Sequence, residues 1–248
     1  MPSSHCGGGT VLRPRTAFDS EVARGGRSAV DNKPQDEGGS VESTTKWNAK
    51  QALPSLYAPK NRQFELVQVP DLNYLSVDGV GDPDGVDFQR AIRSIYPVAY
   101  GVKFLSKRSL GRDYVVPPLE ALWWADDPTV FAAGNRNVWK WTVLILIPAW
   151  ITREHVDTVL HDLEKKNRKP ESTVSVRTIA EGESFQALHV GSFSAEAAVL
   201  SDLHSSLMPD LGKTFSGPHH EIYLSDFRKT APEKLKTILR QPVRSIEP

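Results

Sequence analysis

The order of the predicted secondary-structure elements constrains the fold of this chain more than any single motif. Apolar residues that alternate with polar ones indicate strands, and apolar residues three or four positions apart indicate helices. The predicted order is strand, strand, helix, strand, strand, then a linking helix, then the same series again. Strands are predicted at 64–69, 72–80, 114–124, 139–147, 174–180, 185–190, 219–226 and 236–243.

Two such units predict an α+β fold, in which a duplicated β-α-β-β unit builds a mostly antiparallel sheet. We expect the helices to cover one face of this sheet, packed against Ile222 and Leu224. The opposite face would curve into a ligand groove on the pseudo-twofold axis between the two halves.

Local signals add detail to this prediction. The first two strands meet at Pro70-Asp71, close enough to form a hairpin. Pro97 is expected to kink or break the first helix, because proline removes a backbone donor. Thr152 and Ser194 are expected to cap the two later helices.

Residues 1–58 have almost no apolar periodicity and are rich in Gly, Ser and charged residues. Such a segment buries too little surface to offset its ordering entropy, so we predict a disordered extension followed by one domain at 59–248. The single cysteine, Cys6, lies in this extension, which excludes a disulfide framework and a cysteine zinc site in the domain. No metal site and no cofactor are predicted.

The charges balance, with 30 basic and 30 acidic residues and a formal net charge of zero. Nothing global therefore steers the protein to nucleic acid or to a membrane surface. Apolar runs are far shorter than the roughly 20 residues of a membrane-spanning helix. We expect a cytoplasmic protein, with a monomer favoured, whose partner is a small aromatic molecule.

The strand at 219–226 carries the strongest candidate site. Side chains alternate on a strand, so His219, Glu221 and Tyr223 share one face, and Ile222 and Leu224 share the other. A carboxylate held there costs free energy unless it is paired, hydrated or used. Glu221 is therefore either an ion-pair partner or a ligand-binding or catalytic group.

Four tryptophans fall on two neighbouring predicted strands, and we expect them to form an aromatic box for flat or cationic molecules. Burial in the core is the alternative for each of them. They are Trp123, Trp124, Trp139 and Trp141.

Two further polar residues have a structural and a functional interpretation. Glu120 could be a second pocket carboxylate, although a structural salt bridge is favoured. His189 could bind ligand, although its apolar neighbours favour a hydrogen-bonded core histidine. Basic residues near the C-terminus indicate a solvated edge and not a nucleic-acid surface.

Several short motifs occur in one order along the chain. They include Val69-Pro70, Tyr74-Leu75, Ala91-Ile92, Tyr96, Ala99-Tyr100, Pro118-Leu119-Glu120, Leu122-Trp123-Trp124, Trp139-Lys140-Trp141, Glu181-Gly182, Gln186, His189, the whole of 219–226 and the segment 231–243. With these motifs, the chain from about residue 64 to 243 resembles the GyrI-like small-molecule-binding family, also called the bacterial effector-binding domain. The resemblance is to its stand-alone branch, without a helix-turn-helix.

The resemblance implies a duplicated β-α-β-β fold with a ligand pocket between the halves. By motif, Glu221 is the acidic residue at the floor of that pocket, with Tyr96 and Tyr223 among the ligand-binding residues. Some stand-alone members are similar to hydrolases that open the strained cyclopropane of DNA-alkylating natural products, and others only bind ligands or proteins. The Ala99-Tyr100 pair implies that Tyr100 orients the water or the ligand.

Three hypotheses for function follow. In the first, Glu221 acts as a general base on water in a hydrolase, with Tyr223 or Tyr100 as a hydrogen-bond donor. In the second, the same pocket binds or sequesters aromatic xenobiotics without an activated water. In the third, the domain is a gyrase-type protein-interaction module that uses a surface outside the pocket.

Overall fold

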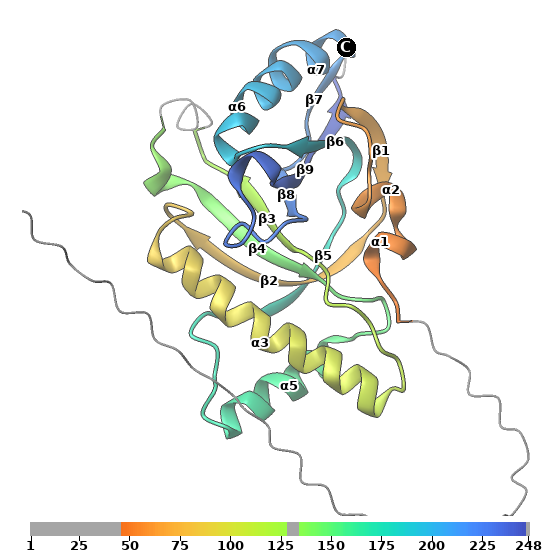
Figure 1. Cartoon of the computed structure of the whole chain (residues 1–248), viewed down its shortest axis with the longest axis vertical. Coiled ribbons are helices and arrows are strands. Elements are labelled where there is room, and N and C mark those ends of the chain that lie inside the picture. The colour runs from red at the N-terminus through yellow and green to blue at the C-terminus, as the bar shows by residue number, and fades with distance from the viewer. Residues whose placement is uncertain (1–45, 128–133, 247–248) are drawn as a thin grey trace, which may run out of the picture. The chain divides into compact units, whose positions relative to one another are not determined.

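Figure 1 shows the computed structural model of the chain, which describes residues 46–127 and 134–246. Both predicted units are present, joined by a linking helix, so the predicted α+β fold is confirmed. The first unit holds β1 (Glu65–Val69), β2 (Leu72–Val80), α3 (Val86–Ser109), β3 (Leu119–Trp124) and β4 (Lys140–Leu146). The helix α5 (Arg153–Lys165) leads to β5 (Ser175–Ile179), β6 (Gly182–Val190), α6 (Phe193–Asp202), β8 (His219–Tyr223) and β9 (Lys236–Ser245).

Short elements complete the described structure. Two helical turns, α1 (Ala49–Ala52) and α2 (Pro54–Tyr57), precede the first strand. A π-helical turn, η2 (Leu203–Leu207), and the turn α7 (Met208–Asp210) extend α6. The 3₁₀ turns are η1 (Arg136–Val138) and η3 (Pro232–Lys234), and the short strand β7 (Lys213–Phe215) pairs with β9.

The strand order of the sheet is β1-β6-β9-β8-β3-β4-β2-β5, with every described pair antiparallel. If each strand is replaced by its counterpart in the other unit, the same order results, read from the opposite edge of the sheet. A pseudo-twofold axis therefore passes between β3 and β8. Ala121 lies opposite Glu221 at the centre of that pair. The two units are therefore joined by a continuous ladder of hydrogen bonds.

The predicted hairpin between the first two strands is wrong. β2 is already paired with β4 on one side and β5 on the other, and β1 pairs with β6 of the second unit. Each unit therefore places its first strand at the far edge of the other unit. The turn at Pro70-Asp71 only redirects the chain between these two positions.

The break expected at Pro97 is also wrong, because α3 runs through it as one helix of 24 residues. Pro97 lies on the exposed side, while Ile95, Val98 and Val102 are fully buried on the other side of the helix. Packing of this apolar stripe offsets the hydrogen bond that the proline removes.

Other boundaries move by a few residues. The strand expected from Tyr114 begins only at Leu119, after the two prolines that precede it. Ser192, and not Ser194, is the N-cap residue of α6. Thr152 is the N-cap residue of α5 as predicted, and its backbone N–H donates to Nδ1 of His155 at 3.1 Å.

The long helices lie on one face of the sheet, as predicted. The core on this face contains residues of α3, α5, β2, β3 and β4, and α5 packs against α3 (Figure 1). A second core on the opposite face contains Tyr74, Leu144 and Ile222 of the sheet together with residues of α1 and α2. The sheet is thus covered on both faces near its centre.

The folded domain begins earlier in the chain than residue 59, where the sequence predicted its start. Leu56 and Tyr57 are at most 2% exposed. The Tyr57 hydroxyl donates to Oε1 of Glu120 at 2.9 Å, and the Leu56 carbonyl accepts from Arg240 at 3.0 Å. The folded domain therefore includes the helical turns from residue 49 onward. The disorder predicted for residues 1–45 lies outside the described residues.

A pair of truncations tests this boundary. A chain that begins at residue 46 keeps every contact described above, and we expect it to unfold near the temperature of the full chain. A chain that begins at Pro59 leaves buried partners of Tyr57 and Leu56 unpaired. We expect it to lose about 3–5 kcal/mol, or about 10 °C in Tm. Equal melting temperatures by circular dichroism would contradict this account.

Candidate functional site

Glu221 lies at the centre of a hydrogen-bonded group on one face of β8. The Tyr223 hydroxyl donates to Oε2 of Glu221 at 2.7 Å, and the indole N–H of Trp123 donates to that hydroxyl at 3.2 Å. Nε2 of His219 lies 3.6 Å from the other carboxylate oxygen. His219 and Tyr223, which were predicted to share a face with Glu221, therefore lie beside its two carboxylate oxygens.

This face is the one that the long helices cover, whereas the sequence placed Glu221 opposite them. Ala121, the cross-strand neighbour of Glu221, belongs to the core under α3. On the other side, the ring of Phe193 at the start of α6 lies 5.8 Å from the Tyr223 ring. Helices therefore flank the site, and this explains why the Glu221 side chain is only 15% exposed.

Glu196, on α6, is a second buried carboxyl group that the sequence reasoning missed. It is 4% exposed, and burial followed by the negative charge of Glu221 raises its pKa to about 9. A hydrogen bond from Thr237 opposes this increase only in part. The signal in the sequence was a lone acidic residue within the small and apolar run Ala195 to Leu200.

The protonation states in this group complement one another. Glu196 keeps its proton at neutral pH and can donate it. Burial and the adjacent Glu221 raise the pKa of Tyr223 well above its ordinary value, so the phenol also remains a donor. Both groups can therefore donate a hydrogen bond at neutral pH.

A cavity of about 350 Å³ lies on the Tyr223 side of this group, and Tyr223 lines it whereas Glu221 does not. Its walls come from α3, from the segment before β3, from α1 with its N-cap residue, and from the loop after β8. The lining residues include Asn48, Lys50, Gln89, Ile92, Tyr96, Leu119, Tyr223, Asp226 and Arg228. Two of the predicted ligand-binding residues, Tyr96 and Tyr223, thus line one cavity.

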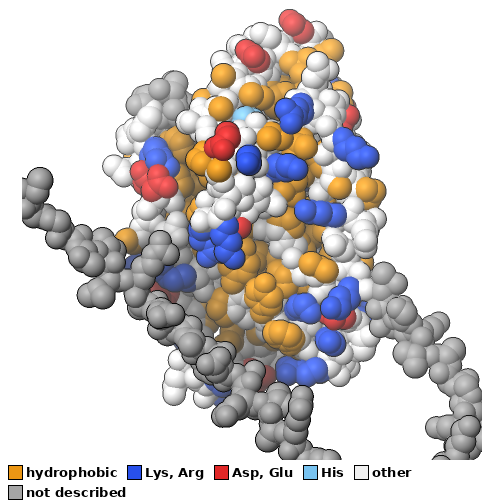
Figure 2. Space-filling view, viewed as in Figure 1, with side chains coloured by type: hydrophobic (Ala, Val, Ile, Leu, Met, Phe, Trp, Pro, Cys, Tyr) orange, Lys and Arg blue, Asp and Glu red, His pale blue; other side chains and the backbone are white. Residues whose placement is uncertain are grey.

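Tyr100 lies outside this cavity lining. Its side chain is 47% exposed on α3, and its ring stacks against that of Tyr96 at 6.3 Å. Phe104 continues the aromatic row one turn further along, and Figure 2 shows apolar side chains gathered over this part of the surface. The phenol that donates to Glu221 is therefore Tyr223 and not Tyr100.

The four tryptophans do not form a single box. Phe88 packs between Trp123, at 5.3 Å, and Trp141, at 5.0 Å, and Trp139 packs edge-on against Trp123 at 6.1 Å. Trp124 packs in the core on the opposite face of the sheet. Trp141 is 2% exposed and lies against Gly79, where a Cβ atom would be 2.1 Å from the ring. Trp141 therefore has the surroundings of a core residue.

His189 lies on the same sheet face as Glu221 but two strands away. Its Nε2 is 3.2 Å from the carbonyl oxygen of Ser192, and its cross-strand neighbour is Thr237. The described residues contain no cluster of three or more His, Cys, Asp or Glu side chains that could hold a metal ion.

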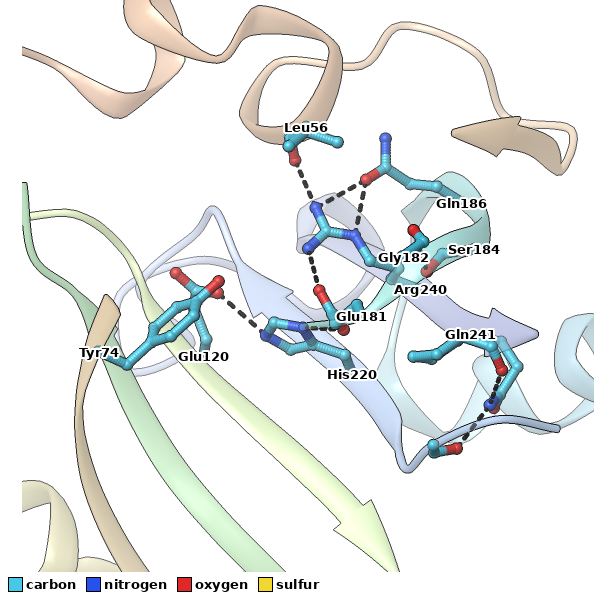
Figure 3. A network of polar contacts seen from close by, with 12 residues as sticks. Leu56, Tyr74, Glu120, Glu181, Gly182, Ser184, Gln186, His220, Arg240 and Gln241 are labelled. Carbon is cyan, nitrogen blue, oxygen red and sulfur yellow. Dashed lines mark hydrogen bonds and ion pairs between the residues drawn. The ribbon is translucent and has the colours of Figure 1, made fainter. Parts of the chain in front are cut away.

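The opposite face of β8 carries a buried charge network (Figure 3). His220 lies between two carboxylates, with Nδ1 at 2.8 Å from Glu181 and Nε2 at 3.0 Å from Glu120. Arg240 donates to Glu181 at 2.9 Å and to the side-chain oxygen of Gln186 at 2.8 and 3.0 Å. Glu120 therefore has the structural role that its sequence context favoured.

The charges in this network shift one another's pKa values. Burial alone would lower the pKa of His220, but Glu181 and Glu120 outweigh it and raise that pKa to about 9. Burial alone would raise the pKa of Glu181, but His220 and Arg240 lower it to about 2. At neutral pH His220 and Arg240 are therefore positively charged, and Glu181 between them is negatively charged.

Three solved structures from Listeria innocua are similar to this chain. One is described as an uncharacterised conserved protein, with 39% identity and a TM-score of 0.74 over 80% of this chain and 100% of its own. Two are described as hydrolases. The first has 39% identity and a TM-score of 0.70 over 80% and 100% of the two chains, and the second has 38% and 0.72 over 81% and 100%. No match is found among the curated proteins.

The model of the GyrI-like small molecule binding domain matches residues 62–244, and the chain belongs to this family. Within the described residues, no helix is both long enough and apolar enough to cross a lipid bilayer.

The pKa values predict how stability depends on pH. His220 binds a proton more tightly in the folded state than in the unfolded chain. Its contribution to the free energy of unfolding is therefore complete below pH 6.5 and is lost as pH rises towards 9. Glu196 also lowers the free energy of unfolding as pH rises from about 4.5 to 9, because its carboxyl group ionises more easily in the unfolded chain. We expect the free energy of unfolding in urea to fall by roughly 3 kcal/mol or more between pH 6.5 and 9.

Glu196→Gln separates the two contributions, because it removes one of the two titrating groups. The decrease between pH 6.5 and 9 should persist in this variant through His220. A variant whose stability is constant or rises over this range would contradict the charged state assigned to His220.

Proposed function

We propose that this protein is a hydrolase that adds water to a strained spirocyclopropane ring in a planar, cyclopropanoid genotoxin. The observation that carries the proposal is the pair of carboxyl groups, Glu221 and Glu196, beside a phenol that donates to Glu221. The similarity to two hydrolases at 38–39% identity supports a hydrolytic reaction. Cytoplasmic detoxification of such compounds is the role that we propose.

In this reaction the cavity lined by Tyr96 and Tyr223 would hold the flat ligand with its cyclopropane towards Glu221. Glu221 takes a proton from water, and the water oxygen bonds to the less hindered cyclopropane carbon. The carbon–carbon bond of the ring breaks, and its electron pair moves into the dienone, which becomes a phenolate. Protonation of that oxygen completes the addition of one water molecule.

Glu196 and Tyr223 have supporting roles in this proposal. The Tyr223 hydroxyl donates to one oxygen of Glu221 and so fixes the orientation of the carboxylate. The protonated Glu196 places a neutral donor, and not a second negative charge, beside the base. Release of ring strain and aromatisation of the product favour the forward direction.

A non-catalytic binding module is the second candidate. The cavity and its aromatic wall would serve binding equally well, and the rim residues Lys50, Asp226 and Arg228 offer both signs of charge to a ligand. This candidate requires no activated water, so turnover separates the two functions.

Glu221→Gln keeps the shape of the side chain and removes the base. With a spirocyclopropane dienone as substrate, we expect turnover to fall by about 10²–10⁴-fold while ligand affinity stays nearly constant. Mass spectrometry that follows the addition of one water measures the rate. Glu233→Gln, at an exposed position on η3, is the matched control and should turn over normally.

Two outcomes would contradict the proposed reaction. Wild-type protein that binds the dienone tightly but adds no water beyond the uncatalysed rate would favour the binding module. Normal turnover by Glu221→Gln would show that another group activates the water.

A second comparison tests the binding cavity. Tyr96 and Tyr100 lie one turn apart on α3, but only Tyr96 lines the cavity. Tyr96→Ala should weaken binding of a planar aromatic ligand by about 1–3 kcal/mol, and Tyr100→Ala should have less than a third of that effect. Isothermal titration calorimetry measures both. Equal losses would place the ligand along the exposed aromatic row and not in the cavity.

A further inference from the structure

A row of polar groups extends from Glu221 away from the ligand cavity. On adjacent strands, Tyr223 lies opposite Thr237, Glu221 opposite Leu239, and the β8–β9 register places His219 beside Gln241. The cavity lies at the Tyr223 end of this row. His219 therefore lies on the side of Glu221 that faces away from the proposed substrate.

His204, on the π-helical turn η2, lies above the far end of the row. Its electrostatic neighbours include His219 and the side chain of Gln241, and Phe215, which packs against it, pairs with Val243 of β9, two residues beyond Gln241. Its ring packs edge-on against Phe215 at 4.9 Å, and Phe215 is 49% exposed. Single π-helical turns inside helices occur often at functional sites.

Buried polar atoms without a partner gather along this row. Both ring nitrogens of His219, Nε2 of His204 and Oε1 of Glu196 are buried and have no hydrogen-bond partner within the described residues. Buried polar atoms are normally satisfied by protein or by ordered water. Four such atoms along one short path are suited to a chain of water molecules.

We propose that His219 and His204 form a proton relay, which connects Glu221 to solvent beside Phe215, on the side opposite the substrate cavity. This inference rests on the proposed hydrolysis. His219 and His204 would be proton-transfer residues that act through Glu221 and do not touch the substrate.

The chemistry of the rings fits this role. Burial, followed by the neighbouring His219, lowers the pKa of His204 to about 4, so His204 is neutral at pH 7. A neutral imidazole has one donor and one acceptor nitrogen, so it can accept a proton on one side and release one on the other. Glu196 is the other titratable group that faces Glu221 from α6, and its own proton is retained.

The relay accounts for the protons that the proposed reaction takes up and releases. Glu221 gains one proton when water attacks, and the phenolate product requires one proton. The product can take its proton from solvent on the cavity side, while the proton on Glu221 leaves through His219 and His204 to solvent. No net proton is consumed, and Glu221 is ready for the next water.

His204→Leu and His204→Gln test the relay, because both remove proton transfer and the second keeps a polar group near Gln241. We expect kcat for the spirocyclopropane dienone to fall at least about tenfold in both variants, with ligand affinity unchanged. Added imidazole should restore much of the loss, because it can carry the proton in place of the missing ring. His161→Gln, exposed on α5, is the matched control.

The outcomes separate the relay from the proposed reaction. Absence of wild-type turnover would overturn both. Wild-type turnover together with unchanged kcat in both His204 variants would overturn the relay alone. A reduced kcat that imidazole does not restore, with a lowered melting temperature, would show that His204 is structural and would also overturn the relay.

Discussion

The structure depends on the buried ion network around His220 and Arg240. An isolated charge in a protein interior costs several kcal/mol, so these groups are tolerated only because each has an oppositely charged partner. The partners come from β3, from the connection before β6, and from the carbonyl and phenol groups of the N-terminal segment. The network therefore fixes the register of β3 against β8 across the pseudo-twofold axis and holds the N-terminal segment against the sheet.

The same network determines where the candidate site lies. Neighbouring side chains on a strand point to opposite faces, so His220 and Glu221 cannot both enter the network. With His220 fixed between Glu181 and Glu120, Glu221 must face α3 and α6. There its negative charge meets Glu196 and the Tyr223 hydroxyl. The strand β8 thus has one face with paired buried charges and an opposite face on which Glu221 accepts from Tyr223 and lies near Glu196.

The folded domain begins before the segment that the family model matches. Residues 62–244 carry the family pattern, yet Tyr57 is buried against Glu120, and Asn48 and Lys50 line the cavity. These residues escaped the sequence interpretation because two helical turns are too short to show apolar periodicity. Their stability comes from the sheet that they cover and not from local preference.

The sequence by itself determined the duplicated element order, the α+β class and the shared face of His219, Glu221 and Tyr223. These follow from periodicity, which is a local property of the chain. Only the tertiary structure decided that β1 pairs with β6, that α3 continues through Pro97, and that Trp124 faces away from the other tryptophans. It also brought Glu196 to Glu221 and left Tyr100 exposed. These contacts join residues far apart in sequence, and which face each helix covers is fixed by packing and by buried charge.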